Sequence, residues 1–222
     1  INRKKEIVKS RVLTARLIQN KLAELNHSIN SFISASGVGY YGAITNSKIY
    51  TETDDSHLDF ISDCCVQWEN AVNQFNKSTR TAILRLGIIL DKDKGALAKI
   101  AGIVKNRIGS PIGTGKQFMP WIHLDDAVEM FFHALTNTTT KGIYNAVASE
   151  HVNNDFFTKT LAKKLNKKLI LPNVPSFVLK FIYGELADIL LEGSKISNEK
   201  IKSQGFDFKY DLIEDALNEI YS

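Results

Sequence analysis

The chain has 222 residues, of which 44% are hydrophobic, 9% aromatic and 23% charged, a composition that excludes disordered and fibrous proteins. Its 28 basic and 24 acidic residues leave a net charge of only +4, and the basic residues are scattered, so no nucleic-acid partner is expected. No apolar run is long enough to span a bilayer and the N-terminal ten residues lack the apolar core of a signal peptide, so we expect a cytoplasmic protein without a membrane partner.

The first half of the chain alternates helical with strand patterns. Apolar residues recur at steps of three and four over residues 3–25, which predicts an amphipathic helix. The apolar and β-branched run 31–36, SFISAS, predicts a buried strand. A second helix is expected over 60–75, and TAILRLGIIL at 81–90 is the strongest strand pattern in the chain.

The pattern continues through the second half. We expect helices over 97–104, 125–135 and 153–165, and strands over 121–123 and 142–148. In the helix over 125–135, Asp126 and Glu129 have the spacing of a capping box. Val128, Phe131 and Leu135 are expected to form its apolar stripe toward the core.

Beyond Pro175 the pattern is mostly helical, and Asp211 and Glu214 repeat the capping-box spacing. Strands that alternate with helices of this length are typical of an α/β fold, in which crossover helices connect parallel strands. The sequence contains no internal repeat or low-complexity tract.

Two glycine-rich segments resemble phosphate-binding loops, and we reject both. GVGYYG at 37–42 follows a predicted strand, but the polar, β-branched residues after it do not open the helix that a dinucleotide phosphate loop requires. GTGK at 113–116 lacks the glycine spacing and the following Ser or Thr of a Walker loop.

Other polar residues permit more than one interpretation. His123, Asp125 and Asp126 could form an acid/base set or a metal cluster, but adjacent carboxylates before a helix are more often caps, so no metal is expected. Trp121 and His123 line a pocket or fill the core, and the sequence leaves both open. The adjacent Cys64 and Cys65 lie beside an apolar helix stripe, which favours buried, inert thiols in a reducing compartment.

Taken together, four segments closely resemble one family, the atypical extended short-chain dehydrogenase/reductases often labelled NAD-dependent epimerases or nucleoside-diphosphate-sugar epimerases. These segments are 34–42, 84–90, 111–128 and 184–217. The resemblance implies an α/β fold in which 1–148 form the C-terminal part of a Rossmann-like doubly wound parallel sheet. Residues 149–222 would form a small, mostly helical substrate-side lobe. It also implies NADP, or NAD, as cofactor, a small-molecule substrate, and a possible homodimer.

This chain departs from the family pattern at its N-terminus. Family members resemble one another most at a GGTGxIG loop on the first strand, whereas this chain begins at what resembles the fourth helix of the sheet. The resemblance implies a fragment that lacks roughly 70 to 90 residues, including the pyrophosphate loop. The strand over 31–36 is then expected to have an unpaired edge.

The second departure concerns catalysis. Oxidoreductases of this superfamily use a Ser, a Tyr and a Lys four residues after the Tyr. Ser36 falls at the Ser position, but no Tyr of this chain has a Lys four residues later, and Ile61 and Cys65 fall at the Tyr and Lys positions. We therefore expect an NAD(P)-dependent oxidoreductase or epimerase-like enzyme of unknown substrate, with a non-catalytic NAD(P)-binding sensor or scaffold as the alternative.

The resemblance also implies site residues. Ser36 and His123 are the candidate catalytic residues, because an imidazole titrates near neutral pH. The candidate cofactor neighbours are Ser34, Ala35, Ser36, Arg85, Gly87 and Ile88. The candidate substrate residues are Tyr41, Gln117 and Trp121, with Ser36 and Tyr41 expected on one wall of the site and Gln117, Trp121 and His123 on another.

Overall fold

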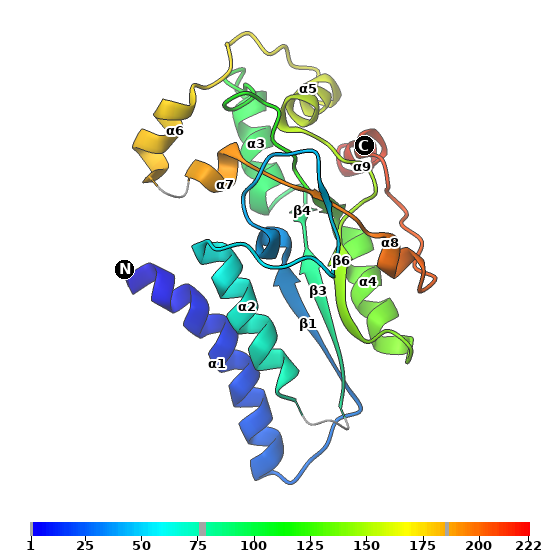
Figure 1. Ribbon diagram of the computed structural model, residues 1–222. Coiled ribbons are helices and arrows are strands. Elements are labelled where there is room, and N and C mark those ends of the chain that lie inside the picture. Colours follow the sequence, from blue (N-terminus) through cyan, green and yellow to red (C-terminus); the bar gives the residue numbers. More distant parts are fainter. Residues whose placement is uncertain (1, 76–78, 185–186) are drawn as a thin grey trace.

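A three-stranded parallel sheet forms the centre of the molecule in the computed structural model, which describes residues 2–75, 79–184 and 187–222. Its strands are β1 (Ser31–Gly37), β3 (Arg80–Leu86) and β6 (Gly142–Ala146), in the order β1-β3-β6 (Figure 1). Within the described residues β1 pairs with β3 alone, so it lies at an edge as expected. Glu185 and Leu186, within the family-like segment 184–217, lie outside the described residues.

Helices cover both faces of this sheet. The covering helices are α1 (Asn2–Glu24) and α2 (Phe60–Asn73) on one face and α4 (Leu124–Thr136) on the other (Figure 1). Successive side chains of a strand point to opposite faces. Ile83 of β3 accordingly packs in one cluster with residues of α1 and α2, whereas its neighbours Ala82 and Leu84 pack with residues of α4. The helices predicted over 3–25, 60–75 and 125–135 are therefore confirmed.

The strand predicted over 81–90 is in fact two strands. β3 ends at Leu86, and β4 (Ile88–Leu90) pairs in parallel with β5 (Trp121–His123). Gly87 separates them at a close backbone approach, where an added Cβ would lie 2.7 Å from the carbonyl oxygen of Pro120. The Ile88 N–H donates to that same oxygen at 2.7 Å. The chain thus changes its partner strand at Gly87, where the absence of a side chain permits this close approach.

The apolar stripe predicted for α4 is wrong. Val128 and Leu135 are 58% and 53% exposed, and only Phe131 of the predicted stripe packs partly against the core. The buried face of α4 instead carries the smaller Ala127 and Ala134, with Met130 between them. The small residues let the helix lie close to the sheet, while Val128 and Leu135 point outward.

Both predicted capping boxes are wrong as well. The carboxylate of Asp126 is buried and accepts hydrogen bonds from the backbone N–H groups of Lys209 and Tyr210, at 2.8 and 2.9 Å. Asp211 accepts from the Ser149 N–H at 2.6 Å instead of capping the last helix. These carboxylates therefore hold distant segments together, and α4 is capped by His123.

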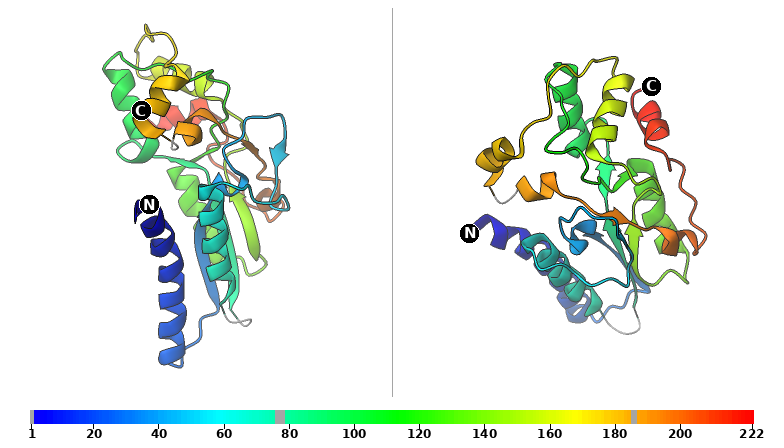
Figure 2. Two further views of the ribbon diagram at one scale, coloured as in Figure 1. Left: turned by 60° about the vertical axis from the view of Figure 1, so that its left-hand side comes forward. Right: turned by 45° about the horizontal axis from the view of Figure 1, so that its top comes forward.

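A second layer of helices lies beyond the carboxyl ends of the strands. It contains α3 (Gly95–Lys105), α5 (Asn154–Lys164) and α9 (Ile213–Ile220), which lie together at the top of Figure 1 and again in the right-hand view of Figure 2. Leu97, Leu161 and Ile213 of these helices share one core cluster with Trp121. This cluster joins α9 to the rest of the fold, while the division into domains 1–148 and 149–222 stays a prediction.

The remaining elements are short. They are the 3₁₀ helix η1 (Val38–Tyr41), β2 (Ile49–Tyr50), α6 (Ser176–Tyr183), α7 (Ala187–Leu191), β7 (Lys195–Ile196) and α8 (Glu199–Lys202). β2 pairs in parallel with β7. Residues Val38–Tyr41 of the segment GVGYYG form η1, and no helix begins at Gly42, as expected from the residues that follow it.

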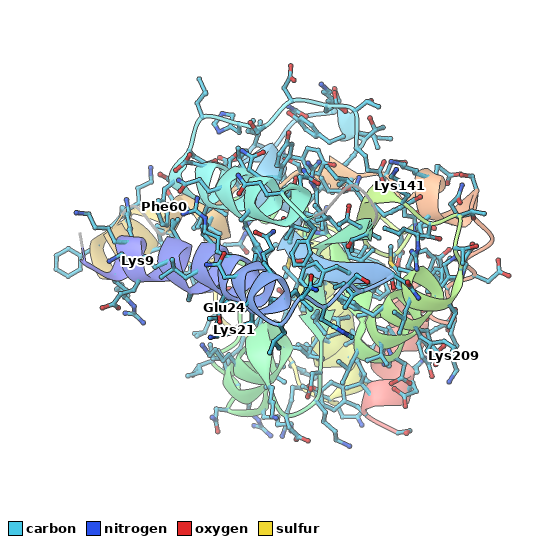
Figure 3. The ribbon with its side chains drawn as sticks, turned by 90° about the horizontal axis from the view of Figure 1, so that it is seen from below. Lys9, Lys21, Glu24, Phe60, Lys141 and Lys209 are labelled. Carbon is cyan, nitrogen blue, oxygen red and sulfur yellow. The ribbon has the colours of Figure 1, made fainter. Side chains whose placement is uncertain are left out.

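The longest described helix, α1, is amphipathic. Its Ala15 is buried in a cluster with Ile83, while Lys9, Lys21 and Glu24 lie on its exposed side (Figure 3). Lys21 and Glu24 form an exposed ion pair. None of the helices in the described part of the chain is both long and apolar enough to cross a membrane.

Candidate functional site

A buried ion pair between α2 and β3 lies near the carboxyl end of the sheet. Glu69 and Arg85 are 4% and 1% exposed, and the Arg85 Nε and Nη2 each donate to one Glu69 carboxylate oxygen at 2.8 Å. Ser36, at the end of β1, donates its hydroxyl to Glu69 Oε1 at 2.7 Å. Two parallel charge-assisted bonds are a strong and geometrically specific arrangement. Glu69 thus fixes both Arg85 and Ser36.

Arg85 extends this network toward β6. Its Nη1 donates to the Tyr41 hydroxyl at 2.8 Å, and that hydroxyl donates to Asn145 Oδ1 at 2.7 Å. The guanidinium also lies 3.3 Å from the centre of the Tyr40 ring, a cation–π contact. Asn145 Nδ2 in turn donates to the Ser197 carbonyl at 3.0 Å. We call the five residues Ser36, Tyr41, Glu69, Arg85 and Asn145 the Glu69 cluster.

Burial and charge set the ionisation of this cluster. Burial alone would lower the pKa of Arg85, but the hydrogen bonds and charge of Glu69 outweigh it and raise that pKa, so the guanidinium stays protonated. Burial raises the pKa of Tyr41 to about 12, against the opposing effect of Arg85. Tyr41 is therefore a neutral phenol at physiological pH and is not poised to act as a base.

Tyr41 is expected to make the fold sensitive to alkali. The unfolded phenol loses its proton near pH 10 and the folded one near pH 12, so Tyr41's contribution to stability is complete below pH 10 and lost as pH rises through 12. Within that window the loss is about 1.4 kcal/mol per pH unit. Urea unfolding of the wild type and of Tyr41→Phe should show their stability difference shrinking across the window. A difference that is constant with pH would contradict this.

A largely apolar cleft of about 470 Å³ opens beyond the ends of the parallel strands. Val38 and Gly39, directly after β1, and Ile88, directly after Gly87, line one side of it. The segments 117–120 and 189–194 line another side, and one face of α3 completes it. Open α/β sheets bind ligands outside the carboxyl ends of their strands, so this cleft is the candidate functional site.

Only some of the residues predicted from the sequence lie at this site. Gln117 and Ile88 line the cleft. Ser36, Tyr41 and Arg85 are brought together, but in the Glu69 cluster, where each is 4% exposed or less. Of the other predicted cofactor neighbours, Ser34 is buried on β1, and Ala35 and Gly87 are partly exposed. None of these three belongs to the cleft lining in the described chain.

Trp121 and His123 lie on β5 and are not among the residues that line the cleft, although Trp121 pairs with the lining residue Ile88. Trp121 is 1% exposed and packs in the core cluster with Leu97 and Leu161. His123 is 3% exposed, and its Nδ1 accepts from the Asp125 N–H at 3.1 Å while Nε2 lies 2.9 Å from a carboxylate oxygen of Glu219. The structure therefore does not arrange Trp121 and His123 as a wall that faces Ser36 and Tyr41.

Sequence reasoning missed Glu69 and Asn145 as members of the cluster. The available signal was that Glu69 and Arg85 each interrupt an otherwise apolar pattern, one on a helix and one on a strand, with opposite charges.

The expected buried thiols are confirmed, since Cys64 and Cys65 are both buried and free. Burial raises the pKa of Cys65 to about 11, which keeps the thiol protonated.

Comparison with known sequences identifies relatives over almost the whole chain. The domain family described as "Domain of unknown function (DUF1731)" matches residues 174–220. The chain is 38% identical over 221 residues to the Arabidopsis thaliana protein named "Epimerase family protein SDR39U1 homolog, chloroplastic", and it spans 62% of that protein's length. It is 30% identical to the human "Epimerase family protein SDR39U1" over 97% of this chain and 74% of the human protein.

Solved structures share the fold. The crystal structure of human epimerase family protein SDR39U1 (isoform 2) with NADPH superposes with a TM-score of 0.93 at 29% identity, covering 99% of this chain and 75% of that one. A UDP-glucose 4-epimerase from Thermotoga maritima superposes with a TM-score of 0.76 at 15% identity, over 99% of this chain and 71% of that one, which shows the fold alone. By its fold and by its identity to the human protein, this chain belongs to the SDR39U1 epimerase family, with a Rossmann-like α/β fold.

Proposed function

We propose that the chain acts as an NAD(P)-dependent oxidoreductase or epimerase-like enzyme on a small molecule. The observation that carries the proposal is the cleft beyond the carboxyl ends of β1 and β3, the place where open α/β sheets bind nucleotides. The human relative, crystallised with NADPH, supports NADP as the cofactor, with NAD as the alternative.

The residues at the strand ends fit the nicotinamide end of such a cofactor. Gly39 has no side chain, and with Val38 and Ile88 it leaves an apolar surface at the cleft. These three residues would hold the nicotinamide, which when bound supplies a hydride donor or acceptor. Arg85 would act indirectly, because its bonds to Glu69 and Tyr41 fix the ends of β1 and β3 that carry these residues.

Ser36 and His123 remain the proposed catalytic residues. Their burial also supports the alternative function, a non-catalytic NAD(P)-binding sensor or scaffold. The Ser36 hydroxyl is engaged by Glu69, and both His123 ring nitrogens have partners. A protein whose polar groups are committed in this way could bind NADP without turnover, as a sensor or scaffold. The two functions differ in whether removal of these side chains changes a rate.

Calorimetric titration of the chain with NADPH tests the cofactor part of the proposal. Binding with a dissociation constant below about 100 µM, equivalent to about −5.5 kcal/mol, would support a cofactor site within this chain even without the pyrophosphate loop of the family pattern. The absence of a binding signal at high protein concentration would contradict cofactor binding by this chain. Val66, which is partly buried on α2 outside the cleft lining, offers a control through Val66→Ala, which should bind NADPH unchanged.

Ser36→Ala separates the enzyme from the scaffold. If the proposed role is right, NADPH oxidation with carbonyl substrates falls about 100-fold or more, the usual effect of a lost acid/base group. The lost hydrogen bond to the Glu69 carboxylate costs about 1.5 to 3 kcal/mol of stability, so thermal melting of the variant must show that it is folded at the assay temperature. His123→Asn, which retains an acceptor for the Asp125 N–H, is the companion variant. NADPH binding without turnover, unchanged in both variants, would favour the scaffold.

A further inference from the structure

The charges that line the cleft do not suit a diphosphate. In the described chain they are Asp59, Lys99 and Glu192, two carboxylates and one ammonium, and no arginine or histidine lines the cleft. Diphosphates are usually held by arginine forks or by several cations. Helix α3 presents the apolar side of its turns, including Ile100 and Ile103, so its contribution to the wall is mainly hydrocarbon. The electrostatic character of the lining therefore opposes the diphosphate of a sugar nucleotide, and of NADP only the nicotinamide end is proposed to lie here.

Among the polar residues that line the cleft, Gln117 is distinguished by a buried atom without a partner. It is 2% exposed, and its Nε2 donates to the carbonyl oxygens of Ile112 and Leu190, both at 3.1 Å. Because these two acceptors require the NH₂ group, the amide cannot be flipped. Its other atom, Oε1, is buried without a hydrogen-bond partner.

An unpartnered buried acceptor is costly, by about 1 to 3 kcal/mol, and is rare in native structures. Ile112 and Leu190, the residues that fix the Gln117 amide, also line the cleft. Gln117 is itself a lining residue, so its unsatisfied oxygen lies beside the cavity and not in a remote part of the core. A hydroxyl or amide N–H on a molecule bound in the cleft would supply the missing donor.

We propose that the cleft takes a largely apolar molecule with one hydroxyl or N–H donor, in preference to a nucleoside diphosphate sugar, and that Gln117 determines this specificity. The inference rests on the proposed function in taking the cleft as the substrate site. The apolar surface supplies most of the binding free energy, since each Å² of apolar surface that is buried contributes about 25 cal/mol. The unpartnered acceptor on Gln117 selects among apolar molecules of equal size.

Three probes test the proposal by calorimetric titration of the 222-residue chain: 2-naphthol, 2-methylnaphthalene and UDP-glucose. The first two have nearly the same shape and differ in one O–H donor. We expect 2-naphthol to bind about tenfold more tightly than 2-methylnaphthalene, since one hydrogen bond contributes about 0.5 to 1.5 kcal/mol. UDP-glucose should give no binding signal. Equal affinities for the two naphthalenes, or tighter binding of UDP-glucose, would overturn the proposal.

Variants assign the preference to Gln117. Gln117→Met should reduce the affinity ratio of the two naphthalenes to about one, because it removes the acceptor but keeps the volume. Gln67→Met, an exposed glutamine on α2 outside the cleft lining, should leave the ratio unchanged. If Gln117→Met fails to fold, the comparison of the three probes on the wild type still decides the outcome.

Saturating NADPH distinguishes the substrate from the cofactor as the source of the donor. The naphthol preference should persist with NADPH present. Loss of the preference, with NADPH bound, would assign Gln117 to the nicotinamide amide and overturn the substrate proposal. Naphthol selectivity without any NADPH binding would contradict the proposed function and leave this inference intact, so the two can fail separately.

Discussion

Arg85→Met is expected to lower the free energy of unfolding by about 3 to 5 kcal/mol, because it leaves the Glu69 carboxylate buried without its countercharge. For a chain of this size, each kcal/mol moves Tm by about 2 to 4 °C, so Tm should fall by about 6 to 20 °C. The Tyr41 hydroxyl would also lose the donor on Arg85. Calorimetric or circular-dichroism melting measures the effect.

An exposed ion pair provides the matched control. Lys159 and Asp155 form an i,i+4 pair on α5 with 64% and 37% exposed side chains. Such pairs contribute about 0.3 to 0.5 kcal/mol, so Lys159→Met should hardly move Tm. The double variant Glu69→Leu/Arg85→Met removes both buried charges and should regain part of the lost stability. A single variant Arg85→Met that melts like Lys159→Met would show that the buried pair does not stabilise the fold.

The hydrophobic pattern was enough to predict most of the elements. The helices over 3–25, 60–75 and 97–104, and the strands over 31–36 and 142–148, are observed close to the expected bounds. The period of the apolar residues indicates which face of an element is buried. Each of these segments buries the same face along its whole length, so its period is clear. The family resemblance supplied the Rossmann-like topology, which periodicity alone does not fix.

The pattern failed where one segment changes partners. TAILRLGIIL is apolar throughout, yet the part before Gly87 pairs with β1 and β6 while the part after it pairs with β5. An apolar run carries no information about which strand lies beside it. The glycine inside the run was the available signal, because a glycine in a strand often marks a close backbone approach.

Long-range polar contacts were equally beyond prediction from local spacing. Asp126 has the position of a helix cap, but backbone N–H groups of Lys209 and Tyr210 satisfy its carboxylate from 83 and 84 residues away. The Glu69 cluster likewise joins residues from β1, η1, α2, β3 and β6 that no local motif connects. The position of a cleft at the carboxyl ends of the parallel strands could be predicted. Its lining could not, because it depends on the segment 189–194, whose position in the fold the sequence pattern does not predict.

Gly193→Ala is expected to destabilise the protein by about 3 kcal/mol and to weaken binding of 2-naphthol in the cleft. A Cβ at this position would overlap the carbonyl oxygen of Phe118. The two residues are also joined by a hydrogen bond from the Phe118 N–H to the Gly193 carbonyl at 3.3 Å, so their backbones cannot separate without losing it. Both residues line the cleft, and the movement would therefore reshape its wall.

Gly102→Ala is the matched control for this substitution. Gly102 lies within α3, and an added Cβ there would meet no atom within 4 Å. In a helix interior, alanine is more stable than glycine by about 0.5 to 1 kcal/mol, so this variant should melt slightly higher than the wild type. It should also bind 2-naphthol unchanged, because Gly102 does not line the cleft. If Gly193→Ala behaved like Gly102→Ala in both measurements, the close approach of the 117–120 and 189–194 segments would not be what shapes the cleft.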